Sequence, residues 1–307
     1  MKSRPNCPHC CPFPKNRVSN VRRSGFFRRA SNLDRIVRYH CNGCSLNFSD
    51  STATHEYRQR RRSINLPLFK LLASNVSMRR SAKILEINRK TVDNRLIYFG
   101  LVSEAKLAEL LLARTPSTAV QFDDVETSEH TKLKPLSVPM VVDGSSRIIL
   151  SFDVVPMPAK GLSAKISVKK YGRRKDERPA GWRSVLQSAA TTCVPGVKIT
   201  SDMHKRYPEM IRRYLPGAVH VATPSRRSSI AGQGELKKGG HDPLFSFNHT
   251  AAMLRANICR LIRRTWCTTK NHPRLKSHIA LYSYWHNESI LAKRESRPVH
   301  FHFANLV

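Results

Sequence analysis

The sequence predicts an α/β protein in which a mixed β-sheet with flanking helices follows a small cysteine-rich domain and an all-α region. Three observations predict this order: two Cys-x-x-Cys pairs near the N-terminus, helical apolar spacing through residues 66–96, and short apolar runs between residues 120 and 222. The chain has 307 residues, 40% of them hydrophobic, which is enough for two or three domains and at least one sizeable core. We expect domains at residues 1–52, 53–113 and 114–307.

Positive charge is the most unusual property of the composition. The chain has 54 Lys and Arg against 21 Asp and Glu, which gives a net charge of +33. A surface with this excess repels itself unless it lies near a polyanion, and nucleic-acid backbones are the commonest polyanions. Ribosomal and membrane-surface proteins share the bias, so charge predicts a polyanionic partner and says nothing about a reaction.

The apolar segments of the sequence indicate where in the cell the protein is expected. No stretch reaches the apolar length of a membrane span, and the N-terminal residues have no apolar signal-peptide region. We therefore expect a cytoplasmic protein with no membrane partner. In that reducing environment the eight cysteines are not expected to form disulfides.

Four cysteines have the spacing of a metal site. Cys7 and Cys10 form one Cys-x-x-Cys pair, and Cys41 and Cys44 form the second. Two such pairs, each on a turn, bring four thiolates to one tetrahedral site, which predicts a structural Zn²⁺ in a zinc ribbon. The alternatives are a pair of disulfides or free buried thiols.

The neighbours of these cysteines leave the ligand set open in detail. His9, His40 and Cys11 are near enough in sequence to replace one of the four thiolates. Tyr39 and Phe48 flank the second pair, and we expect them to form the small apolar core of this domain.

Residues 66–96 predict a helix-turn-helix. A helix over residues 66–73 precedes a capped helix over residues 77–85, a short turn, and a second helix over residues 89–96. The second helix is polar and basic, as recognition in the DNA major groove requires. An ordinary helical hairpin with a solvated basic face is the alternative. A further helix over residues 101–114 is expected either to link to the next domain or to pack two protomers together. Ala82, Leu85, Val92 and Leu96 are expected to face inward, and Arg89, Lys90, Asn94 and Arg95 to be exposed for DNA contact.

The third domain begins with a strand, followed by a hairpin. Three predicted strands are followed by alternating strands and helices, with a helix from His204 and a last, long helix over residues 248–265. This order is that of a ribonuclease-H-like sheet. The predicted strands are residues 120–124, 136–143, 147–154, 197–202 and 218–222.

Asp123 and Asp202 lie at the ends of the first and fourth of these strands. In a ribonuclease-H-like sheet the first and fourth strands are neighbours, so Asp123 and Asp202 are expected to face each other. Two such carboxylates can share hard divalent cations, Mg²⁺ or Mn²⁺, which clamp the attacking and leaving oxygens of a phosphodiester. Any single Asp at a strand end is more often a turn former or a helix cap, and we assign that role to Asp124, Asp143 and Asp153. Asp124 is close enough to act as a partner of the pair.

The segments that carry Asp123 and Asp202 resemble two motifs of the DDE transposases of small bacterial insertion sequences. Val120-Gln121-Phe122-Asp123-Asp124 is similar to the first motif of that family, and Thr200-Ser201-Asp202 followed by residues 204–207 is similar to the second. The resemblance extends to the order of zinc ribbon, helix-turn-helix and catalytic core, so it spans nearly the whole chain.

A third motif departs from the family pattern. Residues 248–250, followed by residues 253–255 and 263–265, resemble the helix that carries the last metal ligand before an Arg-rich stretch. The family usually has Glu there, and this chain has Asn248, whose amide oxygen binds magnesium more weakly. We favour a working Asp-Asp-Asn site over a decayed one because the apolar patterning of the helix is intact. The rival third ligands are Asp242, Glu235 and His249.

Further basic residues suggest contacts to DNA. A basic insertion at residues 158–188 is expected to follow a DNA strand, with Trp182 stacking on a base. A flexible, solvated loop is the alternative. Trp266, Tyr282, Tyr284 and Trp285 are expected to be packing aromatics. The expected phosphate contacts are Lys169, Lys170, Arg173, Arg174, Arg226, Arg227, Arg260, Arg263 and Arg264.

The resemblance implies a transposase that binds the terminal repeats of a mobile element in double-stranded DNA, then nicks the ends and joins them to a target. It also implies a homo-oligomer on DNA, associated with the bacterial nucleoid. Two other hypotheses remain: a sequence-specific DNA-binding regulator derived from an inactive transposase, which Asn248 keeps open, and a nuclease of related structure that does not join strands.

Overall fold

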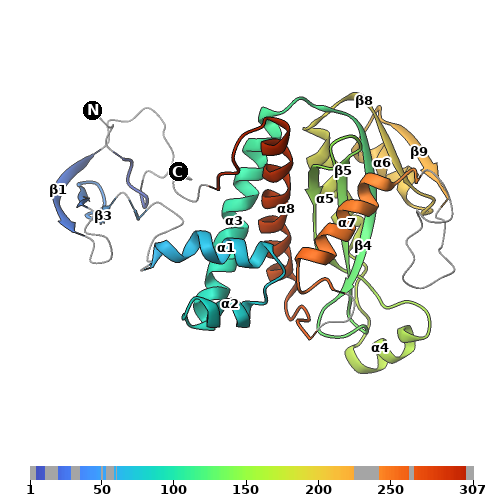
Figure 1. The fold of residues 1–307 in the computed structure, drawn as a ribbon, viewed down its shortest axis with the longest axis horizontal. Coiled ribbons are helices and arrows are strands. Elements are labelled where there is room, and N and C mark those ends of the chain that lie inside the picture. The colour runs from blue at the N-terminus through green and yellow to red at the C-terminus, as the bar shows by residue number, and fades with distance from the viewer. Residues whose placement is uncertain are drawn as a thin grey trace. The chain divides into compact units, whose positions relative to one another are not determined.

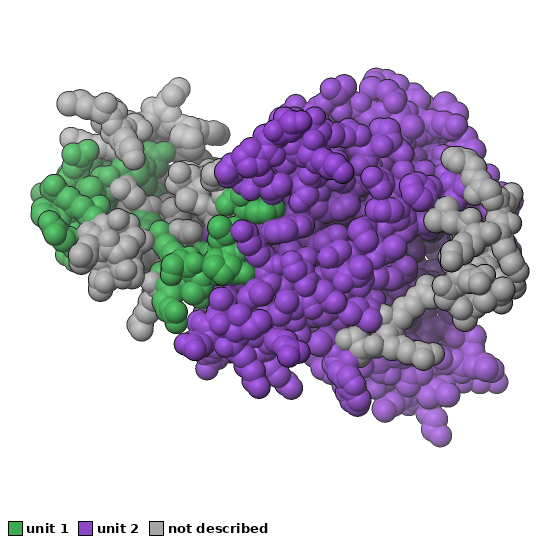
Figure 2. Space-filling model, in the orientation of Figure 1, with its two compact units in different colours: residues 1–67, 301–307 green, residues 68–300 purple. Residues whose placement is uncertain are grey.

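The structure is a computed structural model of the chain, and its described residues form two compact units, residues 1–67 with 301–307, and residues 68–300 (Figure 2). Each unit has its own apolar core. The described residues are 5–10, 20–28, 35–49, 51–52, 59, 61–224, 242–262 and 266–301. Several residues singled out in the sequence lie outside these ranges: Cys11, Arg226, Arg227, Glu235, Arg263 and Arg264.

The first unit contains a three-stranded antiparallel sheet. Its strands are β1 (Val21–Arg28), β2 (Arg35–Cys41) and β3 (Asn47–Ser49), in the order β1-β2-β3. Tyr39 and Phe48 are buried and stack with ring centroids 5.5 Å apart, which confirms their predicted packing role.

The second unit contains a mixed sheet, which confirms the predicted α/β class. Strands β4, β5 and β6 pair antiparallel, β8 lies parallel to β4 on its other side, and β9 lies parallel to β8. The short β7 pairs with β5. The bounds are β4 (Ser117–Ser128), β5 (Pro135–Asp143), β6 (Ile149–Phe152), β7 (Val155–Pro156), β8 (Cys193–Asp202) and β9 (Val219–Thr223).

Helices cover both faces of this sheet. On one face, α5 (Arg178–Ala190) and α6 (Tyr207–Tyr214) pack against Val120 and Phe122 of β4. On the other face, α7 (Phe245–Asn257) and α8 (His272–Arg294) pack against Val125. Because side chains alternate along a strand, even-numbered residues of β4 face the first layer and odd-numbered ones the second. The remaining helix after β7 is α4 (Ser163–Tyr171).

The predicted helical region is present, with different bounds. It contains η1 (Arg62–Ile64), α1 (Asn65–Ala73), α2 (Met78–Ile84) and α3 (Arg89–Ala113). The N-caps are Ser77, whose hydroxyl accepts from the Arg80 N–H at 3.3 Å, and Asn88, whose amide oxygen accepts from the Lys90 N–H at 2.7 Å. Residues 89–96 and 101–113, predicted to lie in separate helices, belong to the single helix α3, which ends at Ala113. Figure 1 shows α3 lying along α8, and this contact explains why no break is needed.

Three expectations for the C-terminal half are wrong. The predicted helix over residues 248–265 ends at Asn257, and the long helix is α8. Trp182 is 0% exposed and belongs to α5, so it packs in the core and is not placed to stack on a base. Trp266 is 101% exposed, which contradicts its predicted packing role. Tyr282 and Tyr284 are buried, as predicted.

None of the helices in the described ranges combines the length and the apolar character needed to cross a membrane.

Candidate functional site

The four predicted cysteines converge on one point in the first unit. The sulfurs of Cys7, Cys10, Cys41 and Cys44 all lie within 4.8 Å of one another. The Cys7–Cys44 and Cys10–Cys41 pairs are each 3.5 Å apart, well beyond a disulfide bond, and all four are free thiols. This confirms the predicted cysteine cluster, which can hold a metal ion such as zinc.

Backbone turns shape this cluster. The Cys41 carbonyl accepts from the Ser45 N–H at 2.8 Å, and the Cys41 N–H donates to the Leu46 carbonyl at 3.0 Å. Ser45 adopts φ 58°, in the left-handed region that such tight turns use. Burial of the Cys7 sulfur opposes ionisation, but N–H groups of Cys10 and His9 pointing at it outweigh burial and lower the pKa of Cys7 to about 6. A lowered pKa favours the thiolate, which is the form that binds metal.

The alternative ligands have other positions. The His9 side chain is exposed and is not part of the four-sulfur cluster. The His40 ring lies with Nδ1 3.0 Å from the Asn47 Oδ1. Among the described residues, therefore, the cluster consists of the four cysteines.

The second candidate site lies at the carboxyl end of β8 in the other unit. Gln121 of β4 pairs with Thr200 of β8, and Phe122 pairs with Ser201. Asp123 and Asp202 are the next residues on these two parallel neighbours, so they stand side by side and on the same face. That face is the one covered by α7 and α8.

Hydrogen bonds orient both carboxylates. Asp123 Oδ1 accepts from the Tyr207 hydroxyl at 3.2 Å and from the Asp124 N–H at 2.7 Å. Asp202 Oδ1 accepts from the His204 N–H at 3.0 Å. The rings of His204 and Tyr207 lie 4.7 Å apart, so the β8–α6 connection supports both acids. Tyr207 and His204 fell within the motif read from the sequence, but only the structure gives them these contacts.

The electrostatics of the pair favour binding of a cation. Burial first, and then repulsion by Asp202, raise the pKa of Asp123 to about 7. Burial also raises the pKa of Asp124 to about 6, even though the Trp182 Nε1–H donates to both of its carboxylate oxygens at 3.0 Å. Asp124 faces α5, on the opposite side of the sheet from Asp123. It therefore ties β4 to α5, which supports the strand that carries Asp123.

Among the described residues, no Lys or Arg neutralises this pair. In that part of the chain neither Asp123 nor Asp202 forms a salt bridge, although Asp143, Asp153 and Asp176 each do. The chain has 54 basic residues, so two adjacent acids without a basic partner in the described ranges are unusual in it. Such an arrangement is stable when a cation from solution binds there.

Asn248 lies in the first turn of α7, beside Asp242. Its side-chain amide donates to Asp242 Oδ2 at 2.9 Å, and its side chain is exposed. Gln121 fixes this turn on β4, because its amide donates to the Pro243 carbonyl at 2.9 Å and its oxygen accepts from the Phe247 N–H at 2.7 Å. Gln121 and Asp123 share one face of β4, so the turn is anchored one same-face position away from the acid pair.

Hydrogen bonds place two of the rival third ligands, Asp242 and His249, in different surroundings. Asp242 lies with Asn248, whereas the Nε2 of His249 is 3.2 Å from the Arg147 guanidinium at the β5–β6 turn. The role of Gln121 was missed in the sequence. The signal was its position two residues before Asp123 on the same strand.

The remaining strand-end acids are structural, as predicted. The buried Asp143 carboxylate accepts hydrogen bonds from Ser117, Ser145 and Ser146 and pairs with Arg114 at 3.1 Å. Although burial opposes ionisation, these hydrogen bonds lower the pKa of Asp143. Asp153 accepts from the Val154 N–H and pairs with Lys276 at 2.9 Å.

The predicted DNA-contacting residues are mostly exposed. Arg89, Lys90 and Asn94 are exposed on α3, but Arg95 is only 8% exposed, so its expected position on the open face is wrong. Arg95 lies on the buried face of α3, at helical spacing from the buried Val92 and Phe99. Of the later residues, Lys169, Lys170 and Arg173 are exposed, and Arg174 lies 3.9 Å from Glu129.

Comparisons with protein-family models and with curated proteins find no match to this chain.

Proposed function

We propose that this protein is a transposase of the DDE type, which binds the terminal repeats of a mobile element and carries out metal-dependent nicking and strand transfer. The observation that carries the proposal is the pair Asp123 and Asp202, side by side on parallel strands and without a basic partner among the described residues. The order of strands supports a ribonuclease-H-like sheet, because an antiparallel run of three is followed by a strand parallel to the first.

The acid pair suits Mg²⁺ or Mn²⁺, since hard divalent cations prefer carboxylate oxygens. Asp123 and Asp202 would hold the metal, with Asn248 on α7 or Asp242 just before that helix supplying a further oxygen. When bound, the metal supplies positive charge to the attacking and leaving oxygens of the phosphodiester. Tyr207 and the His204 N–H hold the two carboxylates in fixed directions. No protein nucleophile is needed, because water or a DNA 3′-hydroxyl can attack.

The other parts of the chain fit DNA binding. A Zn²⁺ on the four cysteines would stabilise the first unit. The second helix of the helix-turn-helix, at the start of α3, presents Arg89, Lys90 and Asn94 to double-stranded DNA. A transposase joins two element ends, so we propose a homo-oligomer on DNA, in the cytoplasm at the bacterial nucleoid.

Cleavage assays test the catalytic proposal. The purified protein is incubated with Mg²⁺ or Mn²⁺ and duplex DNA from both flanks of its gene, and nicked and joined products are separated on denaturing gels. We expect metal-dependent products that disappear with Asp123→Asn and with Asp202→Asn. Asp153→Asn is the matched control, because it removes an acid that pairs with Lys276 outside the site, and it should keep activity. Activity that survives both test substitutions would contradict the proposal, and cleavage without joining would indicate a nuclease.

A DNA-binding regulator derived from an inactive transposase is the second candidate. The observation that favours it is Asn248, an amide where the family usually has Glu, with its N–H₂ engaged by Asp242. Tight binding of the flanking DNA without cleavage would support this function. If Asn248→Glu then raises cleavage, Asn248 lies in the site, and if Asp242→Asn abolishes activity while Asn248→Ala does not, Asp242 is the third ligand.

A further inference from the structure

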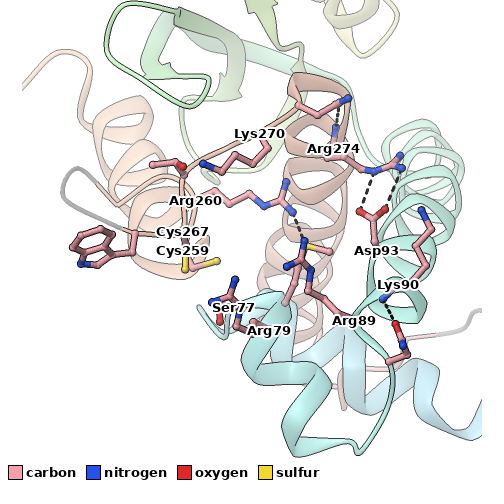
Figure 3. A pocket seen from close by; sticks show the side chains of 15 residues that line it. Ser77, Arg79, Arg89, Lys90, Asp93, Cys259, Arg260, Cys267, Lys270 and Arg274 are labelled. Atoms are coloured by element: carbon pink, nitrogen blue, oxygen red, sulfur yellow. Dashed lines mark hydrogen bonds and ion pairs between the residues drawn. The ribbon is translucent and has the colours of Figure 1, made fainter.

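A pocket of about 870 Å³ lies between the helix-turn-helix and the segment that joins α7 to α8 (Figure 3). Its walls belong entirely to residues 68–300, so it lies within one compact unit. One wall comes from the starts of α2 and α3, and the other comes from residues 259–260 and 266–274, far away in the sequence.

The charge of this pocket is strongly positive. Asp93 is the single carboxylate among the described residues that line it, and the Arg274 guanidinium already binds it, with distances of 3.1 and 3.3 Å to its two oxygens. The pocket therefore needs negative charge from outside. Its lining contains six basic side chains: Arg79, Arg89, Lys90, Arg260, Lys270 and Arg274.

Arg260 shows the imbalance most clearly. Its guanidinium extends across the pocket toward α2, where Nη2 lies 2.6 Å from the sulfur of Met78 (Figure 3). A thioether is a weak acceptor and carries no charge. Burial lowers the pKa of Arg260, and no carboxylate among the described residues forms a salt bridge with it. A guanidinium is a preferred partner of phosphate oxygens, which it binds through two N–H groups.

Two helix N-termini reinforce this charge. Asn88 caps α3 and Asn271 caps α8, and both line the pocket. The positive end of a helix dipole favours an anion, and Arg89 and Lys90 stand in the first turn of α3. Trp266 also lines the pocket and is fully exposed, which is where an aromatic ring can meet a nucleotide.

We propose that this pocket binds backbone phosphates of double-stranded DNA, so that the DNA-binding surface includes Arg260, Lys270 and Trp266 as well as the helix-turn-helix. The inference rests on the part of the proposed function that assigns DNA binding to α2 and α3, and it is independent of catalysis. Bound DNA would then contact both the helix-turn-helix and the segment between α7 and α8. These two helices cover the face of the sheet that carries the acid pair.

A binding assay with matched charge changes tests the pocket. Affinity of the full-length protein for a fluorescein-labelled duplex is measured by anisotropy over a series of salt concentrations. The test variant is Arg79→Gln/Lys270→Gln, two exposed pocket residues, and the control is Arg212→Gln/Lys293→Gln, two exposed residues on α6 and α8. We expect the test variant to bind roughly tenfold more weakly at moderate salt, with a salt slope smaller by about two, one for each lost phosphate contact.

The outcomes separate the pocket from the proposed function. If the unmodified protein binds the duplex and the test variant behaves like the control, the pocket proposal is overturned while DNA binding stands. If the unmodified protein fails to bind duplex DNA, both fail. A loss confined to the test variant supports the pocket.

Tryptophan fluorescence gives a second, local measurement. Trp182 is buried and Trp285 is half-buried, so Trp266 is the one fully exposed indole of the three in the chain. We expect duplex DNA to change the emission of the unmodified protein, and Trp266→Phe to remove most of that change. A change that persists in Trp266→Phe would contradict DNA contact at this pocket. Inorganic phosphate is titrated in parallel, and saturation by phosphate at micromolar concentration without a response to DNA would identify a small-anion site and overturn the DNA assignment.

Discussion

The two compact units are stabilised by different means. The first unit has a small core of Cys7, Val21, Tyr39, Cys41 and Phe48, in which two of the five residues are cysteines of the cluster. The second unit buries an apolar layer on each face of its sheet. A domain with so little apolar surface needs a cross-link, whereas a larger one is stabilised by burial alone.

The difference also explains where unfavourable groups are found. The second unit contains the repelling pair Asp123 and Asp202, the partly buried Arg260 and the fully buried His278. Each of these groups lowers the free energy of unfolding. Only a unit whose apolar core contributes more than that loss can contain them and stay folded. Unfavourable charges therefore lie in the second unit, while the first unit contains a four-cysteine cluster that can hold a stabilising metal ion.

The largest expected effect tests this dependence on metal. Replacing Cys41 by Ser, or removing metal with a chelator, should unfold the first unit and leave the second folded. Structural zinc contributes roughly 10–16 kcal/mol to such small folds. Zinc release is measured by a chromogenic chelator, and unfolding by tryptic cleavage in β1 and β2, which contain several arginines.

Trp fluorescence reports the second unit alone in the same samples, because Trp182, Trp266 and Trp285 all lie in residues 68–300. Cys193→Ser serves as the control, since Cys193 lies on β8 outside the cluster. One bound zinc per chain is expected in the control and none in Cys41→Ser. A tryptic pattern of the first unit that stays unchanged after zinc removal would refute the comparison.

The second prediction concerns packing in the larger unit. A Cβ on Gly100 of α3 would lie 2.6 Å from the Cβ of Ser277 and 2.8 Å from its Cα on α8. Gly100→Ala should therefore separate the two helices and lower the free energy of unfolding by about 3 kcal/mol, the upper part of the range for overpacking. Urea unfolding followed by Trp fluorescence measures this change.

The double variant Gly100→Ala/Ser277→Gly controls for the source of the loss. It removes the Cβ and hydroxyl of Ser277 and should recover part of the stability, although the backbone of α8 would still lie close to the new methyl group. Equal stability of Gly100→Ala and the unmodified protein would mean that α3 and α8 do not pack this closely.

The smallest expected effect is a dependence on pH. His278 is fully buried on α8, and burial lowers its pKa from 6.5 to about 3, while its Nε2 bonds the Leu72 carbonyl at 2.9 Å. Between pH 6.5 and pH 3 the unfolded chain binds a proton at His278 and the folded protein does not. Stability therefore falls as the pH falls through this window, by about 2 kcal/mol between pH 6.5 and pH 5.

His278→Gln should weaken this dependence, because an amide can donate to Leu72 and does not titrate. Urea unfolding at several pH values in the two proteins gives the comparison. The same slope in both proteins would show that other groups cause the acid sensitivity, and that His278 is more accessible than its burial indicates.

The sequence predicted the features that depend on local spacing. The cysteine pairs, the cap at Ser77, and the short apolar runs that make β4, β5 and β8 strands all come from residues close together along the chain. It also placed Asp123 and Asp202 on neighbouring strands, where the structure has them side by side. Asp202 ends β8 as predicted, whereas β4 continues past Asp123 to Ser128.

Features that depend on burial were predicted less well. Trp182 lies in a basic stretch and looked like a surface residue, yet the core of the second unit encloses it. Helix α8 was missed because His278, Ser283 and Asn287 are buried polar residues that break its apolar period. Their positions depend on distant segments, as Asn287 shows by bonding the backbone of Ile149 on β6.

By itself, then, the sequence determined the thiolate spacing, the strand periods and the excess of positive charge, because these need only neighbouring residues. Only the tertiary structure decided that α3 is one helix packed on α8, that Gln121 anchors α7 beside the acid pair, and that Arg260 faces α2 across a positively charged pocket. These contacts join residues far apart in the chain, and their energies depend on burial and distance in three dimensions.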